Sequence, residues 1–415
     1  MLNNYNYLIS MSAISGVLSV SMPVLAVELT PNLQLHGYVT AGLAKLDNNQ
    51  DTTYPNPLSS GTPVIKSKIT SDYDSVAGLQ LNYTVNDQID VATQFYVAAT
   101  GDPDHNYVVR SNWAYLDYKF NDEWSVRVGR FGFASYLYSE NLKVGAAYPW
   151  ARLPSEIYSQ LGGLYSENGI AVLYRHAMDD WILRVQPSFG EEKLEEFKVN
   201  KIKQLSASLS NENLTLHIGS GFASADVDDA SKAALTIGLD GALAGFGYSQ
   251  TDIEQYNAAL HSSVKFNNLH ASFSDVGFLY DDGRWFAAGE LSALRFKGFV
   301  SDFNAGYISA GRYVGKWLPY VLYGQYKSAN VYQADEIPAP GNAIYDATAK
   351  WAQRTVSVGA RYQFKPNVSL KLQVEQVSGF KREYMSGFFL PPPTTTTPST
   401  LKSAYIYSAS LNATF

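Results

Sequence analysis

The sequence predicts an all-β protein, a transmembrane antiparallel up-and-down β-barrel of about sixteen strands, from three observations. Only 17% of the 415 residues are charged while 14% are aromatic, whereas about a quarter of a soluble domain is charged. Segments of about ten residues repeatedly alternate apolar and polar side chains, as strands do between lipid and an aqueous lumen. Finally, short polar turns alternate with long loops between these segments, which is typical of membrane barrels.

The N-terminal segment, residues 1–26, is predicted to be a secretory signal peptide. It has no charged side chain, and Val24-Leu25-Ala26 places small residues three and one before a cleavage point, as signal peptidases require. An N-terminal membrane anchor is the alternative, which Ser, Gly and Pro23 disfavour. Cleavage leaves residues 27–415 as the barrel. They contain no apolar run of about 20 residues, which a membrane helix needs, so strands must cross the membrane.

The strands follow from the alternation of side chains. The first places Leu33, Leu35 and Val39 on one face and Gln34 and His36 on the other. About 9–11 tilted residues are enough to cross the bilayer. The same pattern recurs along the chain and gives sixteen strands, near residues 33–46, 74–85, 88–99, 107–120, 124–131, 167–176, 181–189, 201–210, 213–224, 269–280, 284–297, 302–314, 317–328, 353–364, 367–378 and 403–415.

The connections between these strands sort by length. Short polar turns lie near 86–87, 121–123, 178–180, 211–213, 281–283, 315–316 and 365–367. Long segments lie near 47–74, 131–166, 190–200, 225–268, 328–352 and 379–402. We interpret 225–268 as a long extracellular excursion, although an added hairpin there, using Leu235, Leu239, Tyr256 and Leu260, would give eighteen strands. Residues 379–402 contain three prolines and four threonines in a row and are predicted to be a low-complexity outer loop.

Tryptophans gather at one end of the barrel. Trp124, Trp181, Trp285 and Trp317 each follow a short turn. Because aromatic rings with a polar tip settle at the boundary between lipid and water, we expect these residues to form an interfacial girdle together with Phe415. The alternative is that they are ordinary core aromatics.

The last strand carries a family resemblance. Tyr405, Tyr407, Leu411 and Phe415 face one way, while serine, asparagine and threonine side chains alternate with them. A final alternating strand that ends in Phe resembles the insertion signal of Gram-negative outer-membrane barrels. With the signal peptide and the strand count, the chain resembles the general diffusion porins. The resemblance implies a homotrimer, folding by the barrel-assembly machinery, contact with outer-membrane lipid and lipopolysaccharide, and an indrawn third loop.

The third loop is predicted at residues 131–166 and is expected to constrict the lumen. Its segment from Tyr138 to Tyr158 contains Tyr148-Pro149-Trp150 and Pro154-Ser155-Glu156, which resemble the third-loop region of a porin-like subfamily. The Pro-Glu-Phe-Gly-Gly motif of the best-known porins is missing, so their detailed constriction geometry is not carried over.

Charged residues on the inward face of the strands are candidates for the channel wall, since a charge that faces mid-bilayer costs about 2–4 kcal/mol. Arg130 breaks the alternation, and we expect a bulge near Gly129 to turn it inward. Arg110 also has the lipid-side parity, so it lies near the outer rim or beyond a bulge. In the expected constriction, the loop acids Glu140 and Glu156 face wall arginines; the alternative is that these acids bind the loop to the wall. The candidate pore-lining residues are Arg127, Arg130, Glu140, Arg152, Glu156, Arg184, Glu290, Arg361, Lys371 and Glu375.

No motif for chemistry or cofactor binding is present. Cysteine is absent, the six histidines lack an H-x-x-x-H spacing, and neither G-x-S-x-G nor a P-loop occurs. We therefore expect no enzyme activity, no metal and no cofactor. A net charge of −7 also disfavours nucleic-acid binding, which usually needs a basic face.

These features together predict an outer-membrane channel for passive diffusion of ions and small hydrophilic solutes. A substrate-selective channel, for sugars or organic acids, is the first alternative. A barrel whose long loops act as an adhesin, or an outer-membrane enzyme, is the second.

Overall fold

The computed structural model describes most of the chain between residues 26 and 415. The described residues are 26–47, 54–55, 64–99, 107–161, 163–194, 197–227, 229, 240, 244, 249–263, 267–297, 301–329, 352–379 and 402–415. Residues 1–25 of the predicted signal peptide and the low-complexity part of the loop at 379–402 lie outside these residues, so both remain predictions.

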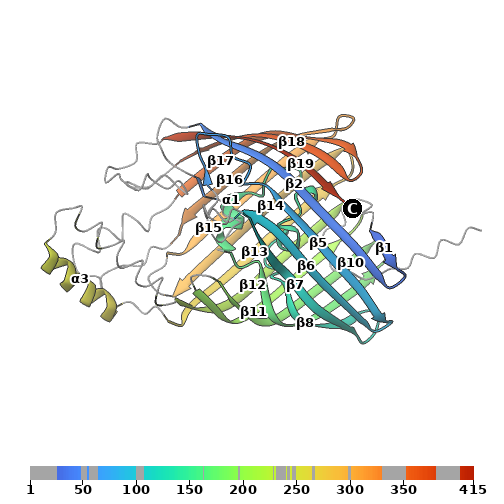
Figure 1. The fold of residues 1–415 in the computed structure, drawn as a ribbon, viewed down its shortest axis with the longest axis horizontal. Coiled ribbons are helices and arrows are strands. Elements are labelled where there is room, and N and C mark those ends of the chain that lie inside the picture. The colour runs from blue at the N-terminus through green and yellow to red at the C-terminus, as the bar shows by residue number, and fades with distance from the viewer. Residues whose placement is uncertain are drawn as a thin grey trace, which may run out of the picture.

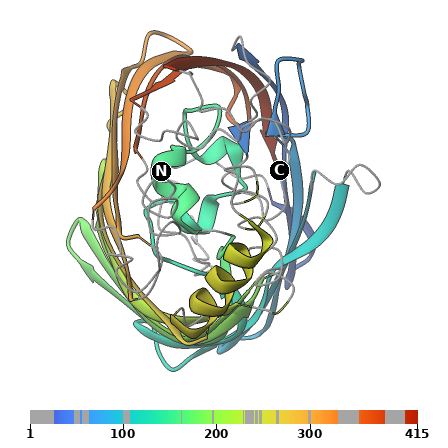
Figure 2. The ribbon, with the colours of Figure 1, turned by 90° about the vertical axis from the view of Figure 1, so that its left-hand side faces the viewer.

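Sixteen antiparallel strands form a closed barrel, in which each strand pairs with its neighbour in the chain and β19 pairs with β2 (Figures 1 and 2). The strands are β2 (Leu33–Asp47), β5 (Val76–Asn86), β6 (Ile89–Ala99), β7 (Tyr107–Lys119), β8 (Trp124–Gly132), β9 (Ser166–Met178), β10 (Trp181–Lys193), β11 (Phe197–Ser210), β12 (Leu214–Val227), β13 (Leu269–Asp281), β14 (Trp285–Lys297), β15 (Phe303–Arg312), β16 (Trp317–Ser328), β17 (Ala352–Lys365), β18 (Val368–Ser378) and β19 (Ser403–Thr414). Closure pairs all the strands laterally, which a lipid environment requires.

Three short strands lie outside the barrel count. β1 (Val27–Thr30) pairs with the beginning of β2, and β3 (Tyr54–Pro55) pairs with β4 (Val64–Ile65). At the seam, the backbone amides of Gly37 and Phe415 donate to each other's carbonyl oxygens, at 2.8 and 2.9 Å. The C-terminal residue therefore completes the pairing between the last and the first barrel strand.

The prediction of sixteen strands is confirmed, and every predicted strand lies within four residues of an observed one at both ends. The eighteen-strand alternative is wrong, because Tyr256 and Leu260 lie in the helix α3 (Gln250–Ser263) instead of a strand. Leu235 and Leu239 lie outside the described residues. Among the described helices, none is long and apolar enough to cross a membrane.

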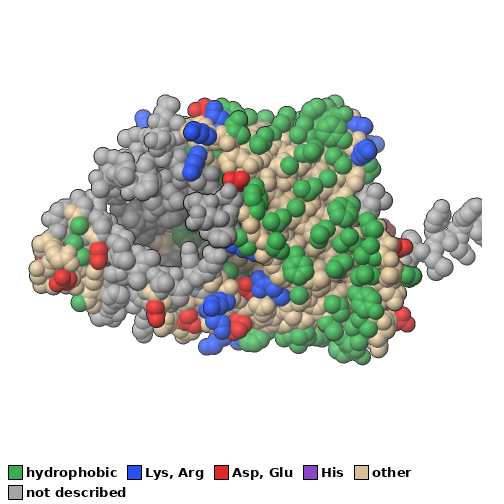
Figure 3. Space-filling view, viewed as in Figure 1, with side chains coloured by type: hydrophobic (Ala, Val, Ile, Leu, Met, Phe, Trp, Pro, Cys, Tyr) green, Lys and Arg blue, Asp and Glu red, His purple; other side chains and the backbone are tan. Residues whose placement is uncertain are grey.

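The two faces of the barrel wall differ in the way the alternation predicts. Along β16, Val321 is 56% exposed on the outer face while its neighbour Leu322, on the inner face, is 5% exposed. Hydrophobic side chains are spread over the barrel wall on the face drawn in Figure 3. Burying this apolar surface requires lipid, so the barrel is an integral membrane protein.

The aromatic residues expected in the girdle lie at the short-turn ends of the strands. Trp124, Trp285, Trp317 and Phe415 are 40–53% exposed, and Trp181 is half-buried. Two of the tryptophans contact tyrosines of the adjacent strand, with ring centroids 4.5 Å apart for Trp124 and Tyr174 and 4.7 Å apart for Trp317 and Tyr362. These rings are where an interfacial girdle would place them.

The backbone is irregular near Arg110 and Arg130, the two arginines that break the alternation. The register of β6 and β7 shifts beside Asn112, so Arg110 pairs with Tyr96, whose side chain is buried. Arg110 therefore lies beyond a bulge, one of its two predicted positions. The expected bulge at Gly129 is wrong: the pairings of β8 run through it without a shift, although Gly129 adopts a φ of 130°. Such a φ is accessible to glycine because it has no Cβ.

The loop between β8 and β9 folds into the barrel, where its short helices are visible in Figure 2. These are η1 (Ser139–Asn141), η2 (Gly145–Ala147), α1 (Ser155–Tyr158) and η3 (Ser159–Leu161). Its apolar side chains pack on inward-facing residues of β13 to β16 in the largest hydrophobic cluster of the described residues. Trp150 lies at its centre, fully buried, with ring centroids 5.4 Å from Tyr307 and 5.9 Å from Phe286. The predicted indrawn third loop is thus a packed layer against one side of the wall.

Candidate channel and its constriction

A buried carboxylate, Glu290 of β14, holds the beginning of the indrawn loop. It accepts a hydrogen bond from the backbone amide of Leu137 at 2.7 Å and another from the Tyr158 hydroxyl at 2.6 Å. The same hydroxyl accepts a hydrogen bond from the Tyr138 amide at 3.1 Å. Glu290, predicted to line the pore, therefore joins both ends of the loop to the wall.

A buried lysine, Lys371 of β18, holds the middle of the loop. Its Nζ donates to the carbonyl oxygens of Gly145 and of Trp150, the latter at 2.8 Å. Beside it, Gln373 accepts from the Ala151 amide at 2.9 Å. Carbonyl groups that no helix or sheet pairs are satisfied in this way. Lys371 is fully buried, so it faces the loop and not the water column.

Glu156 binds the loop to β17 of the wall. Thr355 donates a hydrogen bond to its carboxylate, and Gln353 donates another at 3.1 Å. Burial raises the pKa of Glu156, which the hydrogen bonds only partly offset. Both donors belong to β17, and no arginine bonds Glu156 among the described residues. The expectation that Glu156 faces wall arginines is therefore wrong, because the loop turns its helix α1 toward β17.

Arg152 forms the most connected ionic group of the loop. It bonds the carboxylate of Asp74 at 2.7 and 3.1 Å, the carboxylate of Glu375, and the hydroxyl of Ser408. Its side chain is 5% exposed. Two carboxylates thus surround one buried guanidinium, which ties the loop to β18, β19 and Asp74.

Of three further predicted arginines, two bond a neighbouring side chain and one lines a cavity. Arg130 binds Glu192 through both terminal nitrogens, at 2.6 and 2.7 Å. Arg361 donates to the Tyr313 hydroxyl at 3.1 Å. Arg184 is half-buried and lines a lumen cavity. The larger lumen cavity thus brings Arg184, Arg127 and Glu140 together.

Two cavities inside the barrel meet at Arg127 and Glu140. The larger, of about 830 Å³, opens among the short turns and is lined also by Arg184, Arg175 and His217. The smaller, of about 360 Å³, lies beside β2, β5 and β6. Arg127 and Glu140 line both cavities. The two cavities therefore adjoin at these two side chains.

The charges at this junction are arranged with opposite signs. Arg127 binds Asp117 through two hydrogen bonds of 2.8 and 2.9 Å and lies over the Tyr115 ring at 3.9 Å. Glu140, half-buried in η1, lies within electrostatic range of Arg127 and Arg184. Because Asp117 offsets the charge of Arg127, Glu140 and Arg184 are the less compensated charges at the junction.

Amide side chains, which the sequence reasoning did not single out, line the smaller cavity. Gln94 donates to Gln80 at 2.8 Å, Gln80 donates to Asn82 at 2.9 Å, and Asn112 donates to Gln94 at 2.6 Å. The rings of Tyr38, Trp113 and Tyr115 line the same cavity. The alternation with a period of two predicts which residues of each strand face the lumen. It does not predict the register between strands, which brings these amides together.

A closed sixteen-stranded barrel with a lipid-facing exterior, a water-accessible lumen and an indrawn loop is the fold of the outer-membrane porins. No family model matches the sequence, and no curated protein matches it. Solved structures share the fold, and one is an anion-selective porin from Comamonas acidovorans, with 11% sequence identity, a TM-score of 0.56 and coverage of 92% of this chain and 99% of that chain. OmpT of Vibrio cholerae in trimer form has 14% identity, a TM-score of 0.54 and coverage of 92% of this chain and 99% of that chain. Salmonella typhi OmpF in complex with daunomycin has 12% identity, a TM-score of 0.54 and coverage of 94% of this chain and 100% of that chain.

Proposed function

We propose that this protein is an outer-membrane porin through which ions and small hydrophilic solutes diffuse passively. The observation that carries the proposal is the pair of lumen cavities that meet at Arg127 and Glu140. A barrel of sixteen strands is too wide for its own side chains to fill, and here two cavities remain beside the indrawn loop. What remains is a polar passage whose width and charge select solutes.

The proposal includes no catalytic step, cofactor or metal. Among the described residues, no cluster of three or more histidine, aspartate or glutamate side chains is arranged to hold a metal ion. The assembly we propose is a homotrimer, which the trimer form of the similarly folded OmpT supports. Chemical crosslinking in detergent tests the assembly, since a monomer would give no crosslinked trimer band.

Liposome swelling tests passive diffusion. Liposomes that contain the purified protein are diluted into isotonic sugars of increasing mass. We expect the swelling rate to fall smoothly with solute size and to be similar for chemically different solutes of the same size. Swelling no faster than that of protein-free liposomes, for every solute, would contradict the proposal.

A selective channel for neutral polyhydroxylated solutes is the second candidate. The amides of Gln80, Asn82 and Gln94 and the rings of Tyr38 and Tyr115 line one cavity. Amides bond hydroxyl groups and aromatic rings pack on their apolar faces, so this surface suits sugars. The swelling assay separates the candidates: a selective channel admits one sugar much faster than a neutral amino acid of similar size, whereas a diffusion porin does not.

A further inference from the structure

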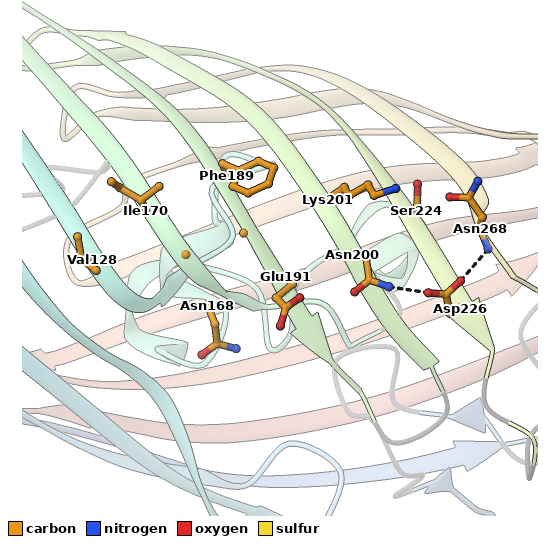
Figure 4. Close-up of a pocket in the computed structure, with 12 residues that line it drawn as sticks. Val128, Asn168, Ile170, Phe189, Glu191, Asn200, Lys201, Ser224, Asp226 and Asn268 are labelled. Carbon is orange, nitrogen blue, oxygen red and sulfur yellow. Dashed lines mark hydrogen bonds between the residues drawn. The ribbon is translucent and has the colours of Figure 1, made fainter.

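Two arginines of the barrel wall, Arg175 of β9 and Arg184 of β10, lie directly opposite each other in the pairing of these strands. On the same strands, Ile170 and Phe189 line a cavity of the outer surface (Figure 4). Because successive side chains point to opposite faces of a strand, Arg175 and Arg184 point into the lumen. There both line the cavity of about 830 Å³ that opens among the short turns.

Neither guanidinium is bonded to an acid. In the part of the chain that the structure describes, no carboxylate lies within ion-pair distance of Arg175 or Arg184, and neither side chain forms a hydrogen bond. The other lumen arginines differ, since Arg127 binds Asp117 and Arg130 binds a glutamate. Arg175 and Arg184 are both half-buried, so water screens their charges less than it screens those of fully exposed groups.

The acids that line the same cavity compensate this pair only in part. Asp117 is bonded to Arg127, and Glu123 is bonded to a histidine of β9 at 2.6 Å. Asp87 and Asp122 are exposed in short turns, where water weakens their attraction. Among the described acids of the cavity, Glu140 is the one whose charge acts on Arg184. Two guanidiniums against one carboxylate leave this side of the cavity positive.

A pair of like charges in register is unfavourable for the fold. Side chains directly opposite each other on antiparallel strands have Cβ atoms about 5 Å apart, and like charges at such positions are destabilising. No hydrogen bond of either arginine to the indrawn loop offsets this cost in the described part of the chain. Departures from the rules that stabilise a fold are expected at functional sites. A bound anion therefore explains the pair better than a structural role does.

The two arginines suit a carboxylate. The guanidinium group is a planar fork of donors that matches the two oxygens of a carboxylate. With Cβ atoms about 5 Å apart, both side chains can reach one anionic group between them. The positive excess of the pair over Glu140 is a single charge, which matches a solute with one carboxylate.

The side chains around the pair are neutral and polar. Ser208 of β11 lies opposite Arg184, and Gln186 is the next residue of β10 on the same inner face. Both line the cavity. The Nε2 atom of Gln186 and the Oγ atom of Ser208 have no hydrogen-bond partner among the described residues. Since buried polar atoms normally have partners, hydroxyl groups of a solute are suitable ones here.

We propose that Arg175 and Arg184 form a binding site for small hydroxylated carboxylates on the short-turn side of the lumen. Each guanidinium donates to the carboxylate, and Gln186 and Ser208 bond the hydroxyl groups of the solute. The inference rests on the proposed function, because the passage brings the solute to the site. It names the class of solute that stays longest in the passage.

Equilibrium dialysis of radiolabelled gluconate against the purified full-length protein in neutral detergent tests the proposal. Gluconate has one carboxylate and five hydroxyl groups. The competitors are sorbitol, which has the same carbon chain without the carboxylate, and acetate, which has the carboxylate without the hydroxyl groups. The variants are Arg175→Gln and Arg184→Gln. The matched control is Arg284→Gln, in an exposed short turn outside the cavity.

We expect the wild type to bind gluconate saturably, with one site per chain. Hydrogen bonds to charged groups are the stronger ones, so each arginine variant should raise the Kd about tenfold or more. Sorbitol should not compete, acetate should compete weakly, and Arg284→Gln should bind like the wild type. Neither arginine variant should have a lower Tm than the wild type, because each removes a repulsion. A structural role of the pair predicts a lower Tm instead.

Three results would overturn the proposal. The first is the absence of saturable gluconate binding to the wild type. The second is equal gluconate affinity in the wild type and both arginine variants. The third is acetate that binds as tightly as gluconate, which would make the pair a simple anion site without preference for hydroxyl groups.

Liposome swelling in sorbitol tests the passage separately from the site. Swelling in sorbitol without gluconate binding in dialysis would keep the porin function and reject the binding site. Gluconate binding that Arg175→Gln and Arg184→Gln abolish, without swelling in sorbitol, would reject passive diffusion and keep the binding site. The two failures are therefore distinguishable.

Discussion

Glu140 of the indrawn loop and Arg127 of the wall line both lumen cavities, so they form the junction between them. The positive charge of Arg127 is offset, because Asp117 binds Arg127 through two hydrogen bonds. Glu140 lies within electrostatic range of Arg184 as well. This asymmetry gives the junction a testable ionic preference.

Neutralising Glu140 should shift ion selectivity toward anions. Glu140→Gln removes a negative charge at the junction while keeping the size of the side chain, so Arg184 is less compensated. Reversal potentials under a KCl gradient in planar bilayers measure the shift. Glu212→Gln, in an exposed short turn, is the control and should leave the reversal potential unchanged. An equal reversal potential in all three proteins would contradict this role of Glu140.

Removing Glu290 should destabilise the indrawn loop. Glu290→Ala leaves the Leu137 amide and the Tyr158 hydroxyl without their acceptor, and each buried donor left unsatisfied costs about 1–3 kcal/mol. We expect trypsin to cut the loop at Lys143 or Arg152 in the folded variant but not in the wild type. A wild-type digestion pattern in Glu290→Ala would show that Glu290 does not hold the loop.

Truncating Trp150 tests the packing of the loop. Trp150 is fully buried among Tyr138, Phe286 and Tyr307, and a large aromatic side chain replaced by alanine typically costs about 3–5 kcal/mol. Trp150→Ala should therefore lower the urea midpoint of loop protection against protease, and it should raise the single-channel conductance as the loop loosens. Unchanged values of both would contradict a packed loop.

The Glu156 carboxyl should make the loop sensitive to pH. Burial raises its pKa above the value of 4.5 in the unfolded chain, so the folded state binds more protons in the interval between the two values. Folding stability then falls as pH rises from about 4.5 through the raised pKa. Thermal unfolding between pH 4 and 8 measures the slope, which Glu156→Gln should reduce because the amide does not titrate. Parallel pH profiles for both proteins would rule out this contribution.

The strands could be predicted because alternation with a period of two encodes both faces of the wall. Register within a hairpin also follows from a short turn. The turn at 121–123 places Asp117 opposite Arg127, so this ion pair could be predicted from the sequence. The side chains that hold the loop could not be predicted. Glu290 and Lys371 have inward parity, but parity cannot distinguish a side chain that faces water from one that a loop covers.

Arg130 and Lys201 illustrate a second limit. Arg130 follows Gly129, which has a φ of 130°, and Lys201 itself has a φ of 52°. Both residues therefore lie where the backbone departs from regular strand geometry. A single irregular residue redirects the side chains around it, and no periodic pattern specifies where it occurs. The cavity on the outer surface beside Phe189 and Lys201 lies at such irregularities, which is why the alternation gave no sign of it.

Cysteine labelling at the junction tests the water-filled passage most directly. The chain has no cysteine, so Glu140→Cys carries a single reactive thiol, and Glu212→Cys serves as the matched control. We predict that a water-soluble, bulky methanethiosulfonate reagent lowers the single-channel conductance of Glu140→Cys and leaves that of Glu212→Cys unchanged. Complete labelling of Glu140→Cys, verified by mass, with no change in conductance would show that ions do not pass between Glu140 and Arg127.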